Sequence, residues 1–297
     1  MALSSLLLGS WQRELAARNL SPRTISNYAD SVAKFTAWCA ERKRATDPAK
    51  QKPGDVTAWL ADLLATGTAS SSTATHYRNL QQWFRWLEAE DEIAANPMAR
   101  LKPPKIDEQV PEVLTDEQLL ALLDACKGTD WLDRRDTAII RLLIDTGMRV
   151  SELVGMTVDD IDFDSNLARV LGKGRRERHA PFGVKAAQAL DRYLRARAKR
   201  PQADHPRLWL SRRGPLGDEA VRTMLAKRAA DAGIGHIHPH QFRHTMAHVW
   251  LDRGGQEQDL MEIGGWRSRQ MLGRYGRSAA AKRAAEAHRR LSPGDRL

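Results

Sequence analysis

Leu167-Ala-Arg-Val-Leu-Gly-Lys173-Gly-Arg-Arg-Glu-Arg-His-Ala-Pro-Phe182 is the stretch that decides the fold class of this chain. Two short runs, 167–171 and 178–182, flank Gly172-Lys173-Gly174, a pattern that predicts a β-hairpin with the lysine at its turn. Elsewhere the apolar residues recur mainly at helical spacing. The sequence therefore predicts a mostly α protein with a small β-sheet.

The first hundred residues are expected to be all helical. Ser21 and Pro22 have the positions of an N-cap and a first helical residue. One apolar stripe then follows at spacings of three and four residues, namely Ile25, Tyr28, Val32, Phe35 and Cys39. We expect further helices at 1–18, at 55–64 and around the stripe from Tyr77 to Leu87. A partner must meet the opposite faces, whose candidate contact residues are Arg23, Lys43, Arg44, Arg78 and Arg85.

Four prolines between 97 and 111 disfavour regular structure and predict a linker over 102–111. Thr115-Asp-Glu-Gln118 is a capping box that opens a new helix. We therefore expect a helical domain at 1–101 and a second, mixed α/β domain at 112–297. The Ala- and Arg-rich residues 276–297 form a tail of this second domain, with 6 basic and 2 acidic residues.

The distribution of charge points to a polyanionic partner. The 297 residues include 47 Lys and Arg against 37 Asp and Glu, a net charge of +10. Residues 107–164 have a net charge of −10, whereas residues 169–213 have a net charge of +11. A basic block of this kind is typical of a surface that faces nucleic acid, although a solvated helix face gives the same pattern.

Composition excludes several other classes of protein. The 2 cysteines exclude a disulfide framework and a cysteine zinc site. No apolar stretch approaches the roughly 20 residues that a membrane span needs, and the N-terminus lacks the features of a signal peptide. We therefore expect a soluble, cytoplasmic protein with no membrane partner.

Five local patterns carry reactive side chains. Thr146-Gly-Met-Arg149-Val-Ser-Glu152 places an arginine and a glutamate one turn apart, and Lys173 lies at the predicted hairpin turn. His240-Gln-Phe-Arg243-His244 places an imidazole and a guanidinium on one helix face, and Trp266 and Tyr275 follow. Each pattern alone also fits an ordinary ion pair, turn or core position. The histidines between 236 and 248 lack an H-E-x-x-H pattern, so we expect no metal and no other cofactor.

Together these residues define a chemical task. Two arginines, a lysine and a histidine are more cations than a stable core gathers without an anion, and a phosphodiester supplies that anion. Guanidinium forks match its non-bridging oxygens, which gain charge in a pentacoordinate transition state. A tyrosine can serve as the covalent nucleophile while lysine or histidine moves protons.

The order and spacing of these patterns resemble the tyrosine recombinase (phage integrase) family, of the simple Xer-like or phage type. The matching stretches are 146–153, 171–181, 240–244 and 263–275, and the resemblance extends over nearly the whole chain. It implies a helical, SAM-like core-binding domain and a mixed α/β catalytic domain that form a C-shaped clamp on duplex DNA. It also implies a homotetramer on two DNA core sites, a Holliday junction and no metal or ATP.

The resemblance also implies a role for each site residue. Arg149 and Arg243 would clamp the scissile phosphate, and Tyr275 would attack it to give a 3′-phosphotyrosyl link. Lys173 would protonate the departing 5′ oxygen and His240 would assist proton transfer. Glu152 would orient its neighbours, and His244 would support the site from the next shell. Besides the five residues of the first domain, we expect Arg175 and Arg176 to contact DNA.

Two departures from the usual pattern of the family bear on the biological role of this protein. Trp266 stands where most members have a second histidine, as in some phage members, and no arm-type DNA-binding domain precedes the core-binding helices. Both favour a phage or mobile-element integrase. The alternatives are a Xer-type recombinase of chromosome dimer resolution, a type IB topoisomerase, and a non-catalytic DNA-binding protein with a relic site.

Overall fold

In a computed structural model of the chain, the backbone divides into two compact units, Met1–Gln109 and Val110–Leu297. The described residues are 3–106, 112–172, 176–266, 268, 269, 272, 288, 289, 292 and 294–296. The predicted linker spans this division, and its residues 107–111 lie outside the described part. The exact domain limits stay predictions. No described helix is long and apolar enough to cross a membrane.

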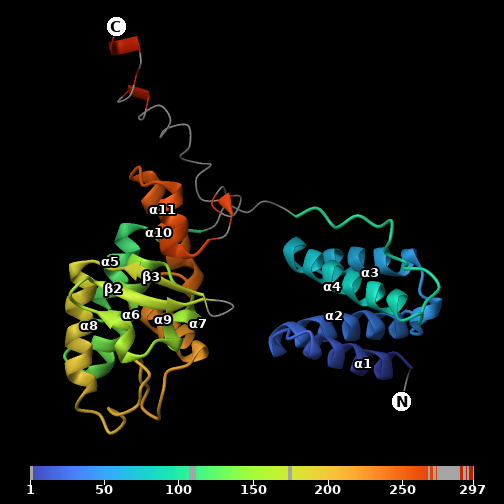
Figure 1. The fold of residues 1–297 in the computed structure, drawn as a ribbon, viewed down its shortest axis with the longest axis horizontal. Helices are drawn as coiled ribbons and strands as arrows, with labels where there is room; N and C mark the ends of the chain where they lie inside the picture. The colour runs from blue at the N-terminus through green and yellow to red at the C-terminus, as the bar shows by residue number, and fades with distance from the viewer. Residues whose placement is uncertain are drawn as a thin grey trace. The chain divides into compact units, whose positions relative to one another are not determined.

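The first unit consists of four α-helices and one short 3₁₀ turn in its described residues (Figure 1). These are α1 (Leu3–Ala17), α2 (Pro22–Glu41), η1 (Pro48–Lys50), α3 (Pro53–Ala65) and α4 (Ser70–Ala89). The Ser21 hydroxyl accepts the backbone N–H of Thr24 at 3.2 Å, which confirms the predicted N-cap. The last three residues of the predicted stripe, Val32, Phe35 and Cys39, are buried. The side chains of Trp11, Trp59 and Phe84 belong to the same apolar core.

The second unit carries the remaining elements. Its helices are α5 (Asp116–Asp124), α6 (Trp131–Thr146), α7 (Val150–Gly155), α8 (Val184–Arg197), α9 (Asp218–Asp231), α10 (Pro239–Asp252) and α11 (Glu257–Gly264). The 3₁₀ turns are η2 (Val158–Asp160) and η3 (Gly294–Arg296). The capping box at the start of α5 is confirmed, because Thr115 and Gln118 exchange side-chain-to-backbone bonds of 3.0 and 3.2 Å.

The predicted hairpin forms, within a three-stranded antiparallel sheet. Its strands are β1 (Ile161–Asp162), β2 (Leu167–Leu171) and β3 (Glu177–Pro181), in the order β1-β2-β3. Val170 lies opposite Arg178, and Ala168 lies opposite Ala180. The two-residue strand β1 was not predicted. The fold class of a mostly helical protein with a small sheet is thus confirmed.

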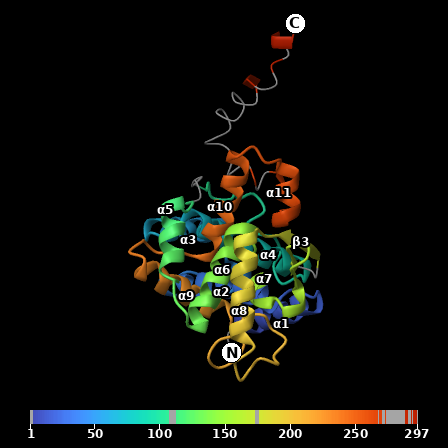
Figure 2. The same ribbon diagram turned by 90° about the vertical axis from the view of Figure 1, so that its left-hand side faces the viewer.

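The position of α6 organises the second unit. This helix packs against α8 on one side and α10 on another, and the views in Figures 1 and 2 show α8 running beside it. Strand β3 contacts both α6 and α11. The C-terminal end of α6, the start of α7, the strand β3 and the helices α10 and α11 therefore meet around one place, where those predicted catalytic residues that the structure describes lie.

Candidate active site

Arg149 is positioned by the turn that joins α6 to α7. Gly147 ends α6 in the left-handed conformation, with φ at 53°. A Cβ there would lie 3.4 Å from the Cα of Arg243, so both the conformation and the close packing require glycine. Arg149 then acts as the N-cap of α7, and its side chain remains 41% exposed.

Glu152 holds Arg149 from two directions. One carboxylate oxygen accepts the backbone N–H of Arg149 at 2.9 Å, and the other accepts its guanidinium Nη1 at 2.7 Å. The first bond closes a capping box, which anchors the backbone of Arg149. Because Glu152 holds the guanidinium of Arg149 through Nη1, its other N–H donors can face a ligand.

Arg178 was not predicted as a site residue, but it lies within the cluster. From β3 its Nη2 donates to Glu152 Oε2 at 2.9 Å, and its Nε donates to the carbonyl of Ile263 at 2.9 Å. Its side chain is only 12% exposed, and that of Glu152 is 4% exposed. The guanidinium thus joins Glu152 of α7 to the backbone of α11.

A signal for Arg178 was present in the sequence. Residues two apart on a strand face the same side, and Ala180 is an apolar residue in the predicted strand. Ala180 is fully buried, so Arg178 points from β3 toward the interior. A buried arginine needs a partner, and the glutamate of the preceding pattern supplies it.

Burial and hydrogen bonding act in opposite directions on Glu152. Burial raises the pKa of this carboxyl. Hydrogen bonds from Arg178 and Arg149, together with the charge of Arg178, lower the pKa by more than burial raises it. The net pKa of Glu152 lies below its ordinary value, so the carboxylate is ionised at neutral pH.

Helix α10 brings His240, Arg243 and His244 to the same place. His238 caps the helix, its backbone N–H donating to Gln241 Oε1 at 2.9 Å, and Pro239 is the first helical residue. Arg243 is 2% exposed, and its Nη1 donates to the carbonyl of Gly147 at 2.9 Å. This bond ties α10 to the turn that carries Arg149.

Trp266 lies directly against Arg243. The Arg243 Cζ sits 3.7 Å from the centre of the Trp266 ring, and Trp266 is 5% exposed. The left-handed Gly265, with φ at 66°, ends α11 and turns the chain so that the indole reaches this position. A Cβ on Gly265 would lie 3.3 Å from Arg178 Cδ, so Arg178 also packs against this turn. The indole supports the guanidinium by a cation–π contact.

His240 and His244 of α10 are neutral at physiological pH. Their rings lie 4.3 Å apart, nearly perpendicular. Burial, followed by the charges of Arg243, His238 and Arg149, lowers the pKa of His240. Burial and the neighbouring His240 lower the pKa of His244 to about 4. A neutral imidazole has one nitrogen free to accept a proton, as proton transfer requires.

The structure thus brings together Arg149, Glu152, His240, Arg243, His244 and Trp266 from the predicted set. Lys173, Arg175 and Tyr275 lie outside the described residues, as does most of the tail 276–297. Arg176 is exposed at the base of the hairpin, where its carbonyl accepts the N–H of Gly172 at 2.8 Å. The described residues contain no group of three or more histidine, cysteine and acidic side chains suited to a metal.

The five candidate DNA contacts of the first unit are all exposed, namely Arg23, Lys43, Arg44, Arg78 and Arg85. Arg44 donates to Asp55 at 2.6 Å and lies over the ring of Trp38, so part of its charge is already compensated. Arg78 donates to Thr75. Their exposure leaves these side chains accessible to a partner.

Comparisons with known proteins agree with this geometry. Residues 112–282 match the model of the phage integrase family, and residues 7–93 match that of the phage integrase N-terminal SAM-like domain. A tyrosine recombinase XerC of Chromobacterium violaceum is 35% identical over 252 residues, which are 84% of this chain and 82% of the relative. XerC of Corynebacterium efficiens is 31% identical over 274 residues, 92% of this chain and 86% of the relative.

Solved structures share the fold at lower identity. The Tn1549 transposon integrase in complex with transposon right end DNA covers 96% of this chain, with a TM-score of 0.77, 20% identity and 99% of its own chain matched. A lambda integrase dimer bound to a core site covers 93% of this chain, with a TM-score of 0.72, 20% identity and 95% of its own chain matched. Because the family model matches more than half of the chain and the relatives match most of it, the chain belongs to the phage integrase family and is a tyrosine-type site-specific recombinase.

Proposed function

We propose that the site cleaves and rejoins DNA strands through a 3′-phosphotyrosyl intermediate on Tyr275. The tyrosine oxygen attacks the scissile phosphorus and forms a P–O bond while the bond from phosphorus to the 5′ oxygen breaks. Neutral His240 assists removal of the tyrosine proton, and Lys173 gives a proton to the departing 5′ oxygen. Attack by the 5′ hydroxyl of a second strand reverses these steps, so rejoining needs no outside energy source.

One observation carries this proposal, which is the convergence of cations around His240. Arg149 and Arg243 both act electrostatically on this histidine, and Arg243 is bonded to the turn that holds Arg149. Two guanidinium groups beside a neutral imidazole suit a phosphate whose charge grows in the transition state. The ring of Trp266 lies against the guanidinium of Arg243 and supports it in this place.

Arg178 has a positioning role in this proposal. It holds Glu152 in the ionised form and in one orientation, and Glu152 in turn holds Arg149. It also bonds to the end of α11, just before Trp266. The buried guanidinium of Arg178 therefore supports both arginines of the proposed phosphate clamp, Arg149 through Glu152 and Arg243 through the end of α11 that carries Trp266.

We further propose that four copies act on two DNA core sites and exchange strands through a Holliday junction. A lambda integrase tetramer bound to a Holliday junction has the same fold, with a TM-score of 0.71 and 20% identity over 91% of this chain and 76% of that protein. The two units would form a clamp around the duplex. Arg23, Lys43, Arg44, Arg78, Arg85, Arg175 and Arg176 would contact the DNA backbone. The tail 276–297 would dock on the adjacent copy, and the reaction would take place on nucleoid DNA in the cytoplasm.

Two biological roles fit this chemistry. Trp266 favours integration of a phage or another mobile element. The relatives named XerC favour the alternative, a Xer-type role in chromosome dimer resolution. Deleting the gene distinguishes them, since loss of a Xer recombinase leaves dimeric chromosomes, whereas loss of an integrase leaves the element's ends unjoined.

A nicked suicide duplex tests the proposed chemistry once the target site has been recovered by selection from random duplexes. Wild-type protein should form a covalent protein–DNA adduct, and Tyr275→Phe should bind the duplex equally well without an adduct. An adduct formed by Tyr275→Phe would contradict the assignment of the nucleophile. Relaxation of supercoils without strand exchange would indicate a topoisomerase instead.

A further inference from the structure

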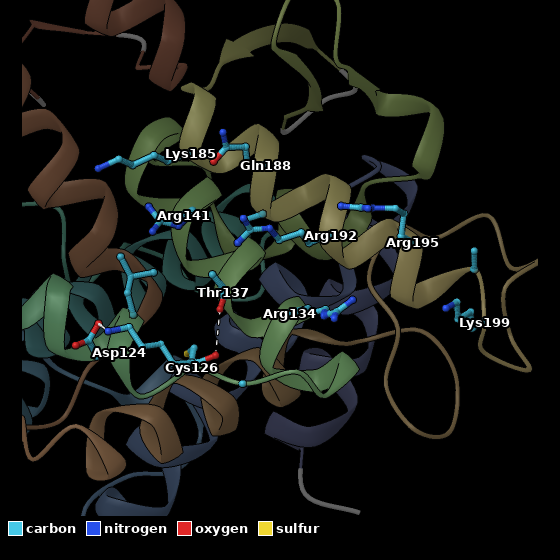
Figure 3. A pocket seen from close by; sticks show the side chains of 15 residues that line it. Asp124, Cys126, Arg134, Thr137, Arg141, Lys185, Gln188, Arg192, Arg195 and Lys199 are labelled. Carbon is cyan, nitrogen blue, oxygen red and sulfur yellow. Dashed lines mark hydrogen bonds and ion pairs between the residues drawn. The ribbon is translucent and has the colours of Figure 1, made fainter.

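A basic groove lies between α6 and α8, away from the proposed active site (Figure 3). It encloses about 1030 Å³ and is lined by 7 lysine and arginine side chains and by a single carboxylate, that of Asp124. None of its lining residues belongs to the proposed site. The function proposed above does not use it.

Two helices supply the cations in two rows. One row consists of Lys199, which lies two residues beyond the end of α8, and of three residues of α8 itself, Lys185, Arg192 and Arg195, at intervals of 7 and 3 residues. These intervals keep the side chains on one helix face, as Figure 3 shows. The opposite wall carries Arg134 and Arg141 of α6. At a rise of about 1.5 Å per residue, the helical part of this row, from Lys185 to Arg195, extends over about 15 Å.

Most of these charges have no counterion among the described residues. Arg195 pairs with Asp191 at 2.8 Å, and Lys127 at the rim pairs with Asp124 at 2.8 Å. For Arg134, Lys185, Arg192 and Lys199, no ion pair occurs among the residues that the structure describes. Arg141 faces Asp145, whose carboxylate also accepts the N–H of Gly183 at 2.8 Å. Several like charges held along one groove repel one another, and an external polyanion relieves that repulsion.

We propose that this groove binds the sugar–phosphate backbone of a second DNA segment, distinct from the strand at the active site. Successive phosphates on one strand of a duplex lie about 3.4 Å apart along the axis, so the helical row of about 15 Å spans about four of these steps. Lysine and arginine on both walls suit phosphate oxygens, and contacts of this kind hold DNA without reading its sequence.

The lining of the groove favours DNA over an acidic protein. Protein interfaces depend on buried aromatic and large apolar anchors. None of the residues that line this groove is aromatic, and Leu123 is its largest aliphatic side chain. Backbone phosphates need no such anchor, because release of counterions supplies the binding free energy.

Salt-dependent binding of non-specific duplex DNA tests the proposal without knowledge of the target site. The test variant combines Lys185→Gln, Arg192→Gln, Arg195→Gln and Lys199→Gln, all at exposed positions. A matched control removes the same charge at exposed positions outside the groove, with Arg18→Gln, Lys50→Gln, Lys227→Gln and Arg253→Gln. Each lost phosphate contact lowers the slope of log K against log salt by about 0.9.

We expect the groove variant to lower that slope by about 3 and the control variant by less than about 1. Adduct formation on a short suicide duplex should stay at the wild-type rate in the groove variant, so this test is independent of the proposed chemistry. Equal slopes for the groove variant and wild type would overturn the proposal. If the groove variant instead lost binding of poly-glutamate while its DNA slope stayed unchanged, the groove would be a surface for acidic proteins and the proposal would be wrong.

Discussion

Replacing Arg178 by methionine isolates the role of the buried guanidinium, because methionine keeps much of the side chain's length and loses its donors. Two hydrogen bonds disappear, to Glu152 Oε2 and to the Ile263 carbonyl. Hydrogen bonds to charged groups are worth about 1.5–3 kcal/mol, and breaking a buried ion pair costs about 3–5 kcal/mol. Glu152 keeps its bonds from Arg149, so we expect the free energy of unfolding to fall by about 3 kcal/mol, measured by urea unfolding.

The same change should slow DNA cleavage at a temperature where the variant is folded. Without Arg178, Glu152 and therefore Arg149 lose part of their support, and a displacement of about 1 Å in a catalytic group costs about 100-fold in rate. We expect single-turnover cleavage of a suicide duplex to slow by about 10- to 100-fold, with DNA affinity unchanged. Arg178→Lys should recover only part of the rate, since one ammonium cannot reproduce the guanidinium fork.

The pH profile separates positioning from mere stability. In the wild type the hydrogen bonds keep the pKa of Glu152 below its ordinary value, so cleavage should not depend on this group near neutral pH. In Arg178→Met, Glu152 stays buried but loses the hydrogen bond and the positive charge of Arg178 that lower its pKa. The pKa of Glu152 should therefore rise. Cleavage by the variant should therefore fall as the pH drops through a range where the wild type is constant.

Arg197→Met is the matched control. Arg197 is another buried arginine, and it donates to the carbonyls of Ala203, Arg207 and Leu208 outside the site. Its loss should lower stability but leave cleavage by the folded protein unchanged. A folded Arg178→Met that cleaves at the wild-type rate with the wild-type pH profile would refute the reasoning.

Three further predictions concern individual side chains. Lys173→Ala should slow cleavage by about 10²–10⁴-fold, and a 5′-bridging sulfur, which needs little protonation to leave, should restore most of that rate; no rescue would remove Lys173 from the acid role. Trp266→His should cleave faster than Trp266→Phe in single-turnover assays because imidazole restores a donor, whereas Trp266→Phe should be the better folded; cleavage by the Phe variant at the wild-type rate would leave the indole a packing role only. The pKa of His244 is about 4 in the folded protein and 6.5 ordinarily, so the unfolded chain takes up a proton that the folded one refuses as the pH falls through this window. Stability should therefore drop between these values, and His244→Gln should flatten the dependence of the urea midpoint on pH; an unchanged dependence would contradict the shift.

Local chemistry explains why so much of the fold could be predicted. The cap at Ser21, the capping box at Thr115 and the hairpin around Lys173 each depend on residues within a few positions of one another. The arginines and histidines of the site could likewise be nominated, because each belongs to a short pattern next to a glycine or a helix start.

Contacts between distant segments escaped the sequence. Arg178 and Ile263 lie 85 residues apart, and nothing local shows that β3 reaches the end of α11. The resemblance placed Trp266 where most family members have a second histidine, but nothing in the sequence showed that its ring would lie 3.7 Å from the Arg243 guanidinium. The basic block at 169–213 was visible as composition, yet only the packing of α6 beside α8 turns part of it into a groove.

The central claim is that Tyr275 becomes covalently linked to the 3′ phosphate of cleaved DNA. Mass spectrometry of the peptides left after the suicide-duplex adduct is digested with protease and nuclease tests it most directly. We expect a nucleotide mass on the peptide that contains Tyr275, attached through the 3′ end of the cut strand. A nucleotide attached to any other residue, or an adduct through the 5′ end, would contradict the account.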